Sequence, residues 1–360
     1  MLTWRFHWSV PEFLKPPIMN KKNKDSFPWG KSLRYLDWEG KSEKLTPSKS
    51  LISSTVHEWY DAKHRKKSPE EICFINSIIL AACPYCRNDA FVKRGKTKGI
   101  QRYRCSSCGR TFTPMAGTIF QDLKIPISEW TEFLLHLFEY HSIKTTARDN
   151  RNAKNTGKYW LVKTFLVLRG IQDKVMLGGR IQLDETSFSV VRSKVVKKDG
   201  KKLRGISRNR IAVAVAKDDS GSMVFLCEYT SKPSNESTWR TLGGHIMEGS
   251  HLIHDGEHSH ECLVRNRKLT QEIHKSRETK GLQDKDNPLS LVNHLHFLIK
   301  DFMKAHGGFT REEIQDWMNL AWFLLSKPEN RYEKVDKFMN MAAKCSQNVK
   351  YRQVFKRKLK

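Results

Sequence analysis

Two short apolar stretches each carry an aspartate where a buried strand is expected. The stretch RIQLDETSFSVV, residues 180–191, has apolar residues on both sides of Asp184, and the apolar run in HLIHDGEHSH, residues 251–260, ends at Asp255. A carboxylate buried without a partner is costly, so it usually has a hydrogen-bonding partner, a bound metal or an altered protonation state. Two carboxylates held close together repel each other, and a divalent cation relieves that repulsion. The pair therefore predicts a Mg²⁺ or Mn²⁺ site, unless each aspartate only caps a strand or lies on the surface.

Four of the eight cysteines form a second candidate metal site. They occur as two C-x2-C pairs with 18 residues between the pairs: Cys83, Cys86, Cys105 and Cys108. Two such pairs can hold one tetrahedral Zn²⁺ ion, and this spacing is typical of a zinc ribbon. Four protein ligands leave no open position, so this zinc would be structural. Seven basic residues and one acidic residue lie between the pairs, which favours a surface facing DNA over a purely stabilising role.

The charge of the whole chain points to the same kind of partner. There are 65 Lys and Arg residues against 38 Asp and Glu, a net charge of +27, which favours a polyanion such as double-stranded DNA. No apolar run approaches the ~18 residues of a membrane-spanning helix, and the N-terminus lacks the apolar core of a secretory signal. We therefore expect no membrane association. The expected location is cytoplasmic, at the nucleoid, in a bacterium and nuclear in a eukaryote.

The elements that must position these groups can be predicted coarsely. A helical pattern covers residues 127–140, and two short helices with a turn near 152–155 follow it within 141–170. This pair fits a DNA-binding helix-turn-helix, although a plain helical hairpin fits as well. Residues 180–260 then read as three strands, a helix and a fourth strand, which predicts a mixed sheet. If its first and fourth strands pair in parallel, the two aspartates become neighbours.

In this order the motifs resemble one known group of enzymes. From about Cys83 to Leu325 the chain is similar to the DDE insertion-sequence transposases with an N-terminal zinc ribbon, the ISXO-like group, with QLDETSF and LIHDGEHSH matching the two aspartate strands. The resemblance implies a mixed α/β fold in which a zinc ribbon and a helix-turn-helix region precede an RNase H-like catalytic core. It also implies a third element, an Asn, His or Glu on a following helix with a lysine seven residues later. Here VNHLHFLIKDFMKAHGG supplies Asn293 and Lys300.

By this resemblance Asp184, Asp255 and Asn293 hold Mg²⁺ or Mn²⁺, and Lys300 assists at a phosphate. Asn293 offers a neutral amide oxygen, a hard ligand that lacks the charge of a carboxylate. Other candidates for the third ligand stay open: Glu257, Glu261, Glu272 and His294.

Two further features lie beside the aspartates. His254, His258 and His260 surround Asp255 and could indicate zinc, but no matching set of Cys or His residues lies nearby in the sequence. Glu185 would point to the opposite face of its strand from Asp184, because side chains alternate along a strand. We therefore expect Glu185 to be structural and paired with a nearby cation.

The expected organisation has five parts: residues 1–70, rich in Trp and Lys and without an assigned role; the zinc ribbon, 71–120; the helix-turn-helix-like region, 121–175; the RNase H-like catalytic domain, 176–330; and a basic helical C-terminal tail, 331–360. The expected function is that of a transposase that binds terminal inverted repeats, cleaves the 3′ ends in a metal-dependent reaction and transfers them to target DNA. Because two ends must be held together, we expect a homodimer or a higher oligomer. The alternatives are a non-catalytic DNA-binding regulator derived from a transposase and a nuclease of the same fold.

Overall fold

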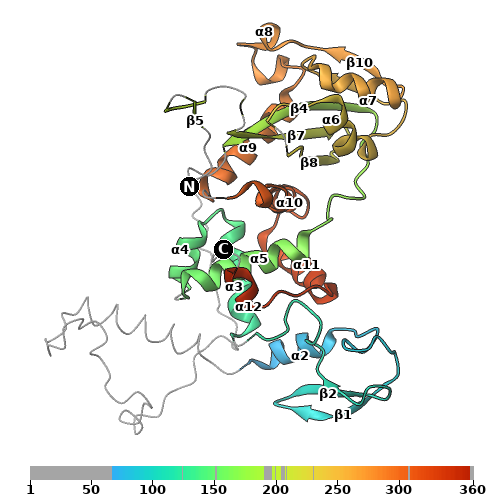
Figure 1. Ribbon diagram of the computed structural model, residues 1–360, viewed down its shortest axis with the longest axis vertical. Helices are drawn as coiled ribbons and strands as arrows, with labels where there is room; N and C mark the ends of the chain where they lie inside the picture. Colours follow the sequence, from blue (N-terminus) through green and yellow to red (C-terminus); the bar gives the residue numbers. More distant parts are fainter. Residues whose placement is uncertain are drawn as a thin grey trace, which may run out of the picture. The chain divides into compact units, whose positions relative to one another are not determined.

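The computed structural model describes residues 67–123, 125–150, 152–189, 197–198, 200–203, 207, 209–229, 231–306 and 309–356 (Figure 1). These residues belong to one compact unit, Lys67–Lys360. Of the N-terminal segment predicted as 1–70, residues 1–66 lie outside the described residues. Within the described part, the helices are too short or too polar to cross a bilayer.

The two C-x2-C pairs flank a small antiparallel hairpin. The elements of this part are α2 (Pro69–Ser77), β1 (Phe91–Thr97), β2 (Ile100–Cys105) and β3 (Thr111–Phe112), with the strands in the order β1-β2-β3. Lys98 and Gly99 connect β1 to β2, and both have positive φ angles, 49° and 81°. A two-residue turn of this kind matches the twist of the strands on either side of it. A β-hairpin, as expected of a zinc ribbon, therefore lies between the cysteine pairs.

A group of helices from two distant parts of the sequence packs together. These helices are α3 (Ile127–Phe138), α4 (Ile143–Asp149), α5 (Lys154–Leu168), α10 (Ile314–Leu325), α11 (Arg331–Lys344) and α12 (Tyr351–Lys356). The predicted helix near 127–140 and the predicted helical pair correspond to α3, α4 and α5. Helix α5 is buried along most of its length and exposes its first turn at Lys154 and Asn155. A role of α4 and α5 in DNA binding stays a prediction.

The C-terminal segment, predicted as a helical tail, packs into this group of helices. Phe338 of α11 is fully buried, and its ring lies edge-on to Trp130 of α3 with 5.7 Å between the ring centroids. The Tyr159 hydroxyl of α5 donates a hydrogen bond to the carbonyl of Val349 at 2.9 Å. Burying one such side chain stabilises a fold by roughly 1.5–3 kcal/mol. Helix α11 is therefore part of the folded core.

A five-stranded mixed sheet forms the second large part of the unit. Its strands are β4 (Arg180–Ser189), β7 (Arg210–Asp218), β8 (Met223–Cys227), β9 (His251–His254) and β10 (Thr270–Ile273). They lie in the order β10-β9-β4-β7-β8, with β7 antiparallel to both of its neighbours and β9 parallel to both of its own. A short hairpin, β5 (Lys197–Lys198) and β6 (Lys201–Lys202), comes between β4 and β7 in the chain. The predicted mixed sheet is present, and β10 is a strand that the sequence analysis did not assign.

Helices cover both faces of this sheet (Figure 1). On one face Ile181, Leu183 and Leu252 pack with residues of α6 (Asn235–Leu242) and α7 (Glu261–Asn266). On the other face Phe188, Val213 and Ile253 pack with residues of α9 (Ser290–Ala305) and α10. Short helical segments complete the chain: η4 (Gly243–His245), η5 (His258–His260), α8 (Ser276–Thr279), η6 (Asp284–Asp286) and η7 (Arg311–Glu313).

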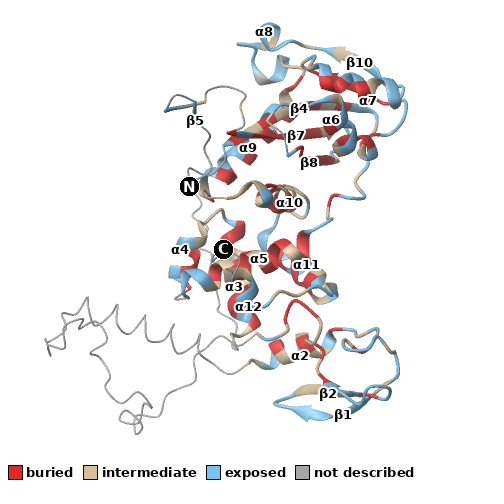
Figure 2. Cartoon of the chain, viewed as in Figure 1, coloured by how far each residue is buried: buried red, intermediate tan, exposed pale blue. Residues whose placement is uncertain are grey.

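One apolar core connects the helices to the sheet. It runs from Ile75 of α2 through Trp130 of α3 and Phe165 of α5 to Ile299 of α9 and Phe338 of α11. Figure 2 shows buried residues, in red, along these helices and along strands of the sheet. Elements from four of the predicted domains therefore contribute to a single core.

Candidate active site

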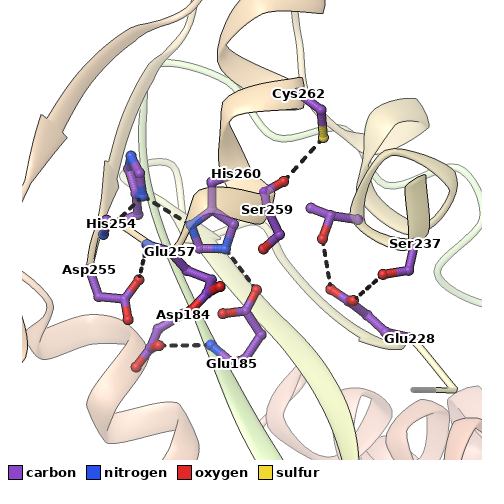
Figure 3. Close-up of polar contacts among 12 residues, drawn as sticks. Asp184, Glu185, Glu228, Ser237, His254, Asp255, Glu257, Ser259, His260 and Cys262 are labelled. Atoms are coloured by element: carbon purple, nitrogen blue, oxygen red, sulfur yellow. Dashed lines mark hydrogen bonds and ion pairs between the residues drawn. The ribbon is translucent and has the colours of Figure 1, made fainter. Parts of the chain in front are cut away.

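The two aspartates predicted as metal ligands come from adjacent strands. Strands β4 and β9 are paired in parallel, and their last registered pair joins Leu183 to His254. Asp184 is the next residue of β4, and Asp255 directly follows the last residue of β9 (Figure 3). The parallel pairing that the sequence reading required is therefore present.

The Asp184 carboxylate is largely buried and lies close to two other carboxylates, those of Glu185 and Asp255. Burial, followed by the negative charges of Glu185 and Asp255, raises its pKa to about 7. The backbone N–H of Glu185 donates to Asp184 Oδ1 at 2.8 Å, and the N–H of Glu257 donates to Asp255 Oδ1 at 2.9 Å. Neither contact brings a positive charge to the pair. A divalent cation would supply that charge, so the donor set fits a metal that prefers oxygen ligands.

Helix α9 carries the residues predicted to complete this site. Asn293 and Lys300 are both exposed, and His296 lies between them on the helix, three residues after the one and four before the other. Residues three or four apart share a helical face. The predicted third ligand and the predicted lysine therefore flank His296 on one face of α9.

His296 of α9 lies beside Asp184, and the sequence analysis missed it. Its Nδ1 lies 3.7 Å from Asp184 Oδ2, which is too long for a hydrogen bond. Its Nε2 is buried without a hydrogen-bond partner among the described residues. Burial, together with the charge of Lys300, lowers the pKa of His296 to about 4, so the ring is neutral near pH 7. The spacing of three residues from Asn293 was the sequence signal that could have revealed it.

Two of the other candidates for the third ligand, Glu272 and Glu261, have partners of their own. Glu272 lies on β10, where it accepts from His274 Nε2 at 2.5 Å and from His251 Nε2 at 3.3 Å, and these bonds lower its pKa to about 2. Glu261 is exposed and pairs with His258 Nδ1 at 3.0 Å. His294 is exposed, and Glu257 is half-buried.

Glu185 has the cationic partner that its position suggested. Its Oε1 accepts from His260 Nε2 at 2.7 Å, and the His260 side chain is fully buried. His254 Nδ1 accepts from the backbone N–H of Gly256, so His260 Nδ1, 3.0 Å away, donates to it as well. Burial opposes a charged ring, but the hydrogen bond and the charge of Glu185 outweigh burial and raise the pKa of His260. Figure 3 shows this chain of side chains beside the two aspartates.

The histidines near Asp255 divide into two groups. The ligand atoms of His254, Asp255 and His260 lie within 4.8 Å of one another, whereas His258 is exposed. His254 also places its Nε2 3.2 Å from Gln271 Oε1 on β10. Hydrogen bonds therefore account for both buried rings without a zinc ion.

The four paired cysteines come together as one cluster. Their sulfur atoms all lie within 4.8 Å of one another, with 3.8 Å between Cys83 and Cys108 and 3.5 Å between Cys86 and Cys105. Sulfur atoms that share a tetrahedral zinc at ~2.3 Å are ~3.8 Å apart. The backbone N–H of Cys108 donates to the Cys105 sulfur, and such bonds lower the pKa of Cys105 to about 7. The residues fit a structural Zn²⁺ ion.

Comparison with known proteins gives a short match. None of the known protein-family profiles matches the chain. Over 66 residues, 18% of this chain, it is 32% identical to an "Uncharacterized protein in transposable element ISH50" of Halobacterium salinarum. The match spans about a fifth of the length of that relative, 21%.

The chain also matches solved structures at low identity. A pre-cleavage Mos1 transpososome and a Mos1 strand transfer complex are each 13% identical to it, with TM-scores of 0.25 and 0.26. The alignments cover 59% and 60% of this chain and 76% of each Mos1 chain. Scores of this size do not establish a common fold.

Proposed function

We propose that this chain is a DDE-type transposase that binds the terminal inverted repeats of its element, cleaves the 3′ ends and joins them to target DNA. The observation that carries the proposal is the position of Asp184 and Asp255, side by side where the parallel pairing of β4 and β9 ends. The order of the sheet supports an RNase H-like core, because three consecutive antiparallel strands are followed by two strands added in parallel to the first. The match to a protein of a transposable element agrees with this function.

In this proposal Asp184 and Asp255 hold Mg²⁺ or Mn²⁺, and Asn293 completes the shell from α9. When bound, such ions activate an attacking water or 3′-hydroxyl and stabilise the leaving oxygen. The protein contributes two adjacent strands whose ends carry the carboxylates and a helix that brings Lys300 to the same face as Asn293. The Lys300 ammonium would bind a phosphate oxygen of the DNA. His296 is a second candidate for the α9 ligand because it is neutral, buried and next to Asp184.

The DNA-binding part of the proposal rests on exposed basic residues. Strand β1 is exposed at every residue after Phe91. Its exposed basic residues are Lys93, Arg94 and Lys96. The exposed first turn of α5 adds Lys154. Contacts between such residues and phosphates supply affinity that falls with rising salt. In this proposal zinc holds the ribbon, and a homodimer or higher oligomer brings two DNA ends together.

An in vitro reaction tests the function. Purified protein is incubated with Mn²⁺ or Mg²⁺ and DNA carrying the element ends, and nicked and joined products are separated by electrophoresis. We expect Asp184→Ala and Asp255→Ala to remove both products while retaining DNA binding in a gel-shift assay. Binding without any nicking by the unmodified protein would favour the regulator, and nicking without joining would favour a nuclease.

The third ligand is tested by three single variants on α9. Asn293→Ala and His296→Ala are compared in the same reaction with Asp301→Ala, an exposed carboxylate on the same helix. We expect Asn293→Ala to lose nicking and Asp301→Ala to retain it. Full activity of Asn293→Ala together with an inactive but folded His296→Ala would move the role to His296.

A further inference from the structure

The backbone pairing of β4 and β9 stops directly before the two aspartates. The registered pairs run from Arg180 with His251 to Leu183 with His254. Beyond that point β4 continues its pairing with β7, whereas the chain after β9 turns away through Gly256. Gly256 has a φ angle of 87°, and a Cβ atom there would lie 2.8 Å from Ile273 Cγ2. The separation of the two carboxylates is therefore not fixed by the backbone ladder itself.

A buried histidine spans the same gap on the other face of the sheet. His260 donates to Glu185 at 2.7 Å and to His254 at 3.0 Å. Glu185 follows Asp184 on β4, and His254 precedes Asp255 on β9 (Figure 3). We call these three side chains the His260 bridge. It joins the two strands one residue away from each aspartate.

Two further contacts tie the bridge to the backbone around Asp255. The N–H of Gly256 donates to His254 Nδ1 at 3.2 Å, and His254 Nε2 lies 3.2 Å from Gln271 Oε1 of β10. The ring of His254, the residue before Asp255, thereby holds the backbone of Gly256, the residue after it. Opposite Glu185, β7 carries the small residue Ala214, which leaves room for the buried polar side chains on this face.

Packing alone does not require this polar arrangement. The core on the same face of the sheet contains apolar residues such as Leu183, Cys262 and Leu263, and its other buried carboxylate, Glu228, bonds to α6 and not between β4 and β9. A buried ion pair often stabilises a fold no better than apolar residues of similar size, so its use calls for another reason. Hydrogen bonds have directions that apolar contacts lack, and they can fix a distance between two strands.

We propose that His260 is a positioning residue whose bridge between Glu185 and His254 sets the separation of Asp184 and Asp255 and so determines the affinity of the pair for a divalent cation. This inference rests on the metal site of the proposed function. Residues that orient the ligands of a metal commonly change its affinity by ~10–100-fold when they are replaced. We therefore expect His260→Ala and Glu185→Ala to weaken Mn²⁺ binding by a factor in that range.

The test is a Mn²⁺ titration of the full, zinc-loaded chain, followed by calorimetry or by the EPR signal of free Mn²⁺, with no DNA present. Glu185→Gln keeps an oxygen that can accept from His260, so it should retain an affinity within a few-fold of the unmodified protein. The matched control is Glu228→Gln. Glu228 is also a buried carboxylate on this side of the sheet, but it accepts from Ser237 and Thr238 of α6 and does not join β4 to β9.

Thermal unfolding of the same variants separates positioning from stability. The proposal expects weak Mn²⁺ binding in His260→Ala and Glu185→Ala, and normal binding in Glu228→Gln even where its unfolding temperature falls. Unchanged Mn²⁺ affinity in a folded His260→Ala or Glu185→Ala overturns it. If His260→Ala does not fold, Glu185→Ala against Glu185→Gln decides the question, and equal affinities of these two refute the bridge.

The outcomes also separate this inference from the proposed function. Mn²⁺ binding that needs Asp184 and the bridge, in a protein that never cleaves DNA, would leave the positioning role standing and refute the transposase. Absence of Mn²⁺ binding in the unmodified protein would overturn both the metal site and the role of His260.

Discussion

Replacing Asp184 by asparagine is expected to stabilise the metal-free protein, and to do so more at high pH than at low pH. The pKa of Asp184 is raised from 3.8 to about 7, first by burial and then by the charges of Glu185 and Asp255. The unfolded chain loses this proton near pH 4, whereas the folded chain keeps it until about pH 7. Folding is therefore penalised increasingly as the pH rises through this interval, and the penalty is absent below it.

The size of the effect follows from the two pKa values. At ~1.4 kcal/mol for each pH unit, a difference of about 3 corresponds to ~4 kcal/mol when fully developed. The side chain is 25% exposed, so solvent screens part of this. We compare the unfolding free energy of Asp184→Asn with that of the unmodified protein at each pH. We expect this difference to shift in favour of the variant by about 2 kcal/mol from pH 5 to pH 8. The asparagine oxygen can still accept from the N–H of Glu185, so the backbone contact is retained.

Urea unfolding of the zinc-loaded protein at pH 5, 6, 7 and 8 measures this difference. The control is Asp336→Asn, at an exposed position of α11, which should show no such trend. Adding Mn²⁺ at pH 8 should stabilise the unmodified protein and leave Asp184→Asn unchanged, because the ion binds only the folded carboxylate pair. A variant that is less stable than the unmodified protein at pH 8, or a gain that does not depend on pH, would refute the reasoning.

Three further outcomes are expected. Cys105→Ser should lower the zinc content measured by atomic emission, because it removes one of the four clustered sulfurs. Gly256→Ala should cost about 1–3 kcal/mol in urea unfolding, because the new Cβ meets Ile273 and φ is positive, whereas Gly244→Ala, with open space around it, should be nearly neutral. Phe338→Ala should cost about 3–5 kcal/mol, and Tyr332→Ala, at a side chain 60% exposed, less than about 0.5 kcal/mol. Equal effects within either pair would contradict the packing described.

The sequence was sufficient where spacing along one element carries the information. The C-x2-C pairs predicted one cluster of four sulfurs, and the cluster is present. The alternation around Asp184 predicted that Glu185 has a separate partner, and it pairs with His260. The three-residue spacing of Asn293 and His296 on one helix was also readable, but spacing alone does not tell which of the two side chains is buried beside Asp184.

Other features depend on where the chain returns in space. His260 follows a turn after β9, and no periodicity indicates that it meets Glu185, 75 residues earlier. The helical pattern of α11 predicts a helix but not its partners, because an apolar face does not specify which other element packs against it. The burial of Phe338 against Trp130 comes from residues far apart in the chain. Such contacts are decided by tertiary packing and not by local pattern.

The single apolar core that joins α2, α3 and α5 to α9 and α11 has a consequence for how such a protein can change over generations. A DNA-recognition module attached by a linker can be exchanged as a unit, and the catalytic part is left intact. Here the helices nearest the ribbon and the helix that carries Asn293 share side-chain contacts through one interior. In the proposed function, we expect a new DNA-binding specificity to arise by substitutions at exposed positions such as those of β1, because replacement of the helices from α2 to α5 would remove side chains from the core that they share with α9.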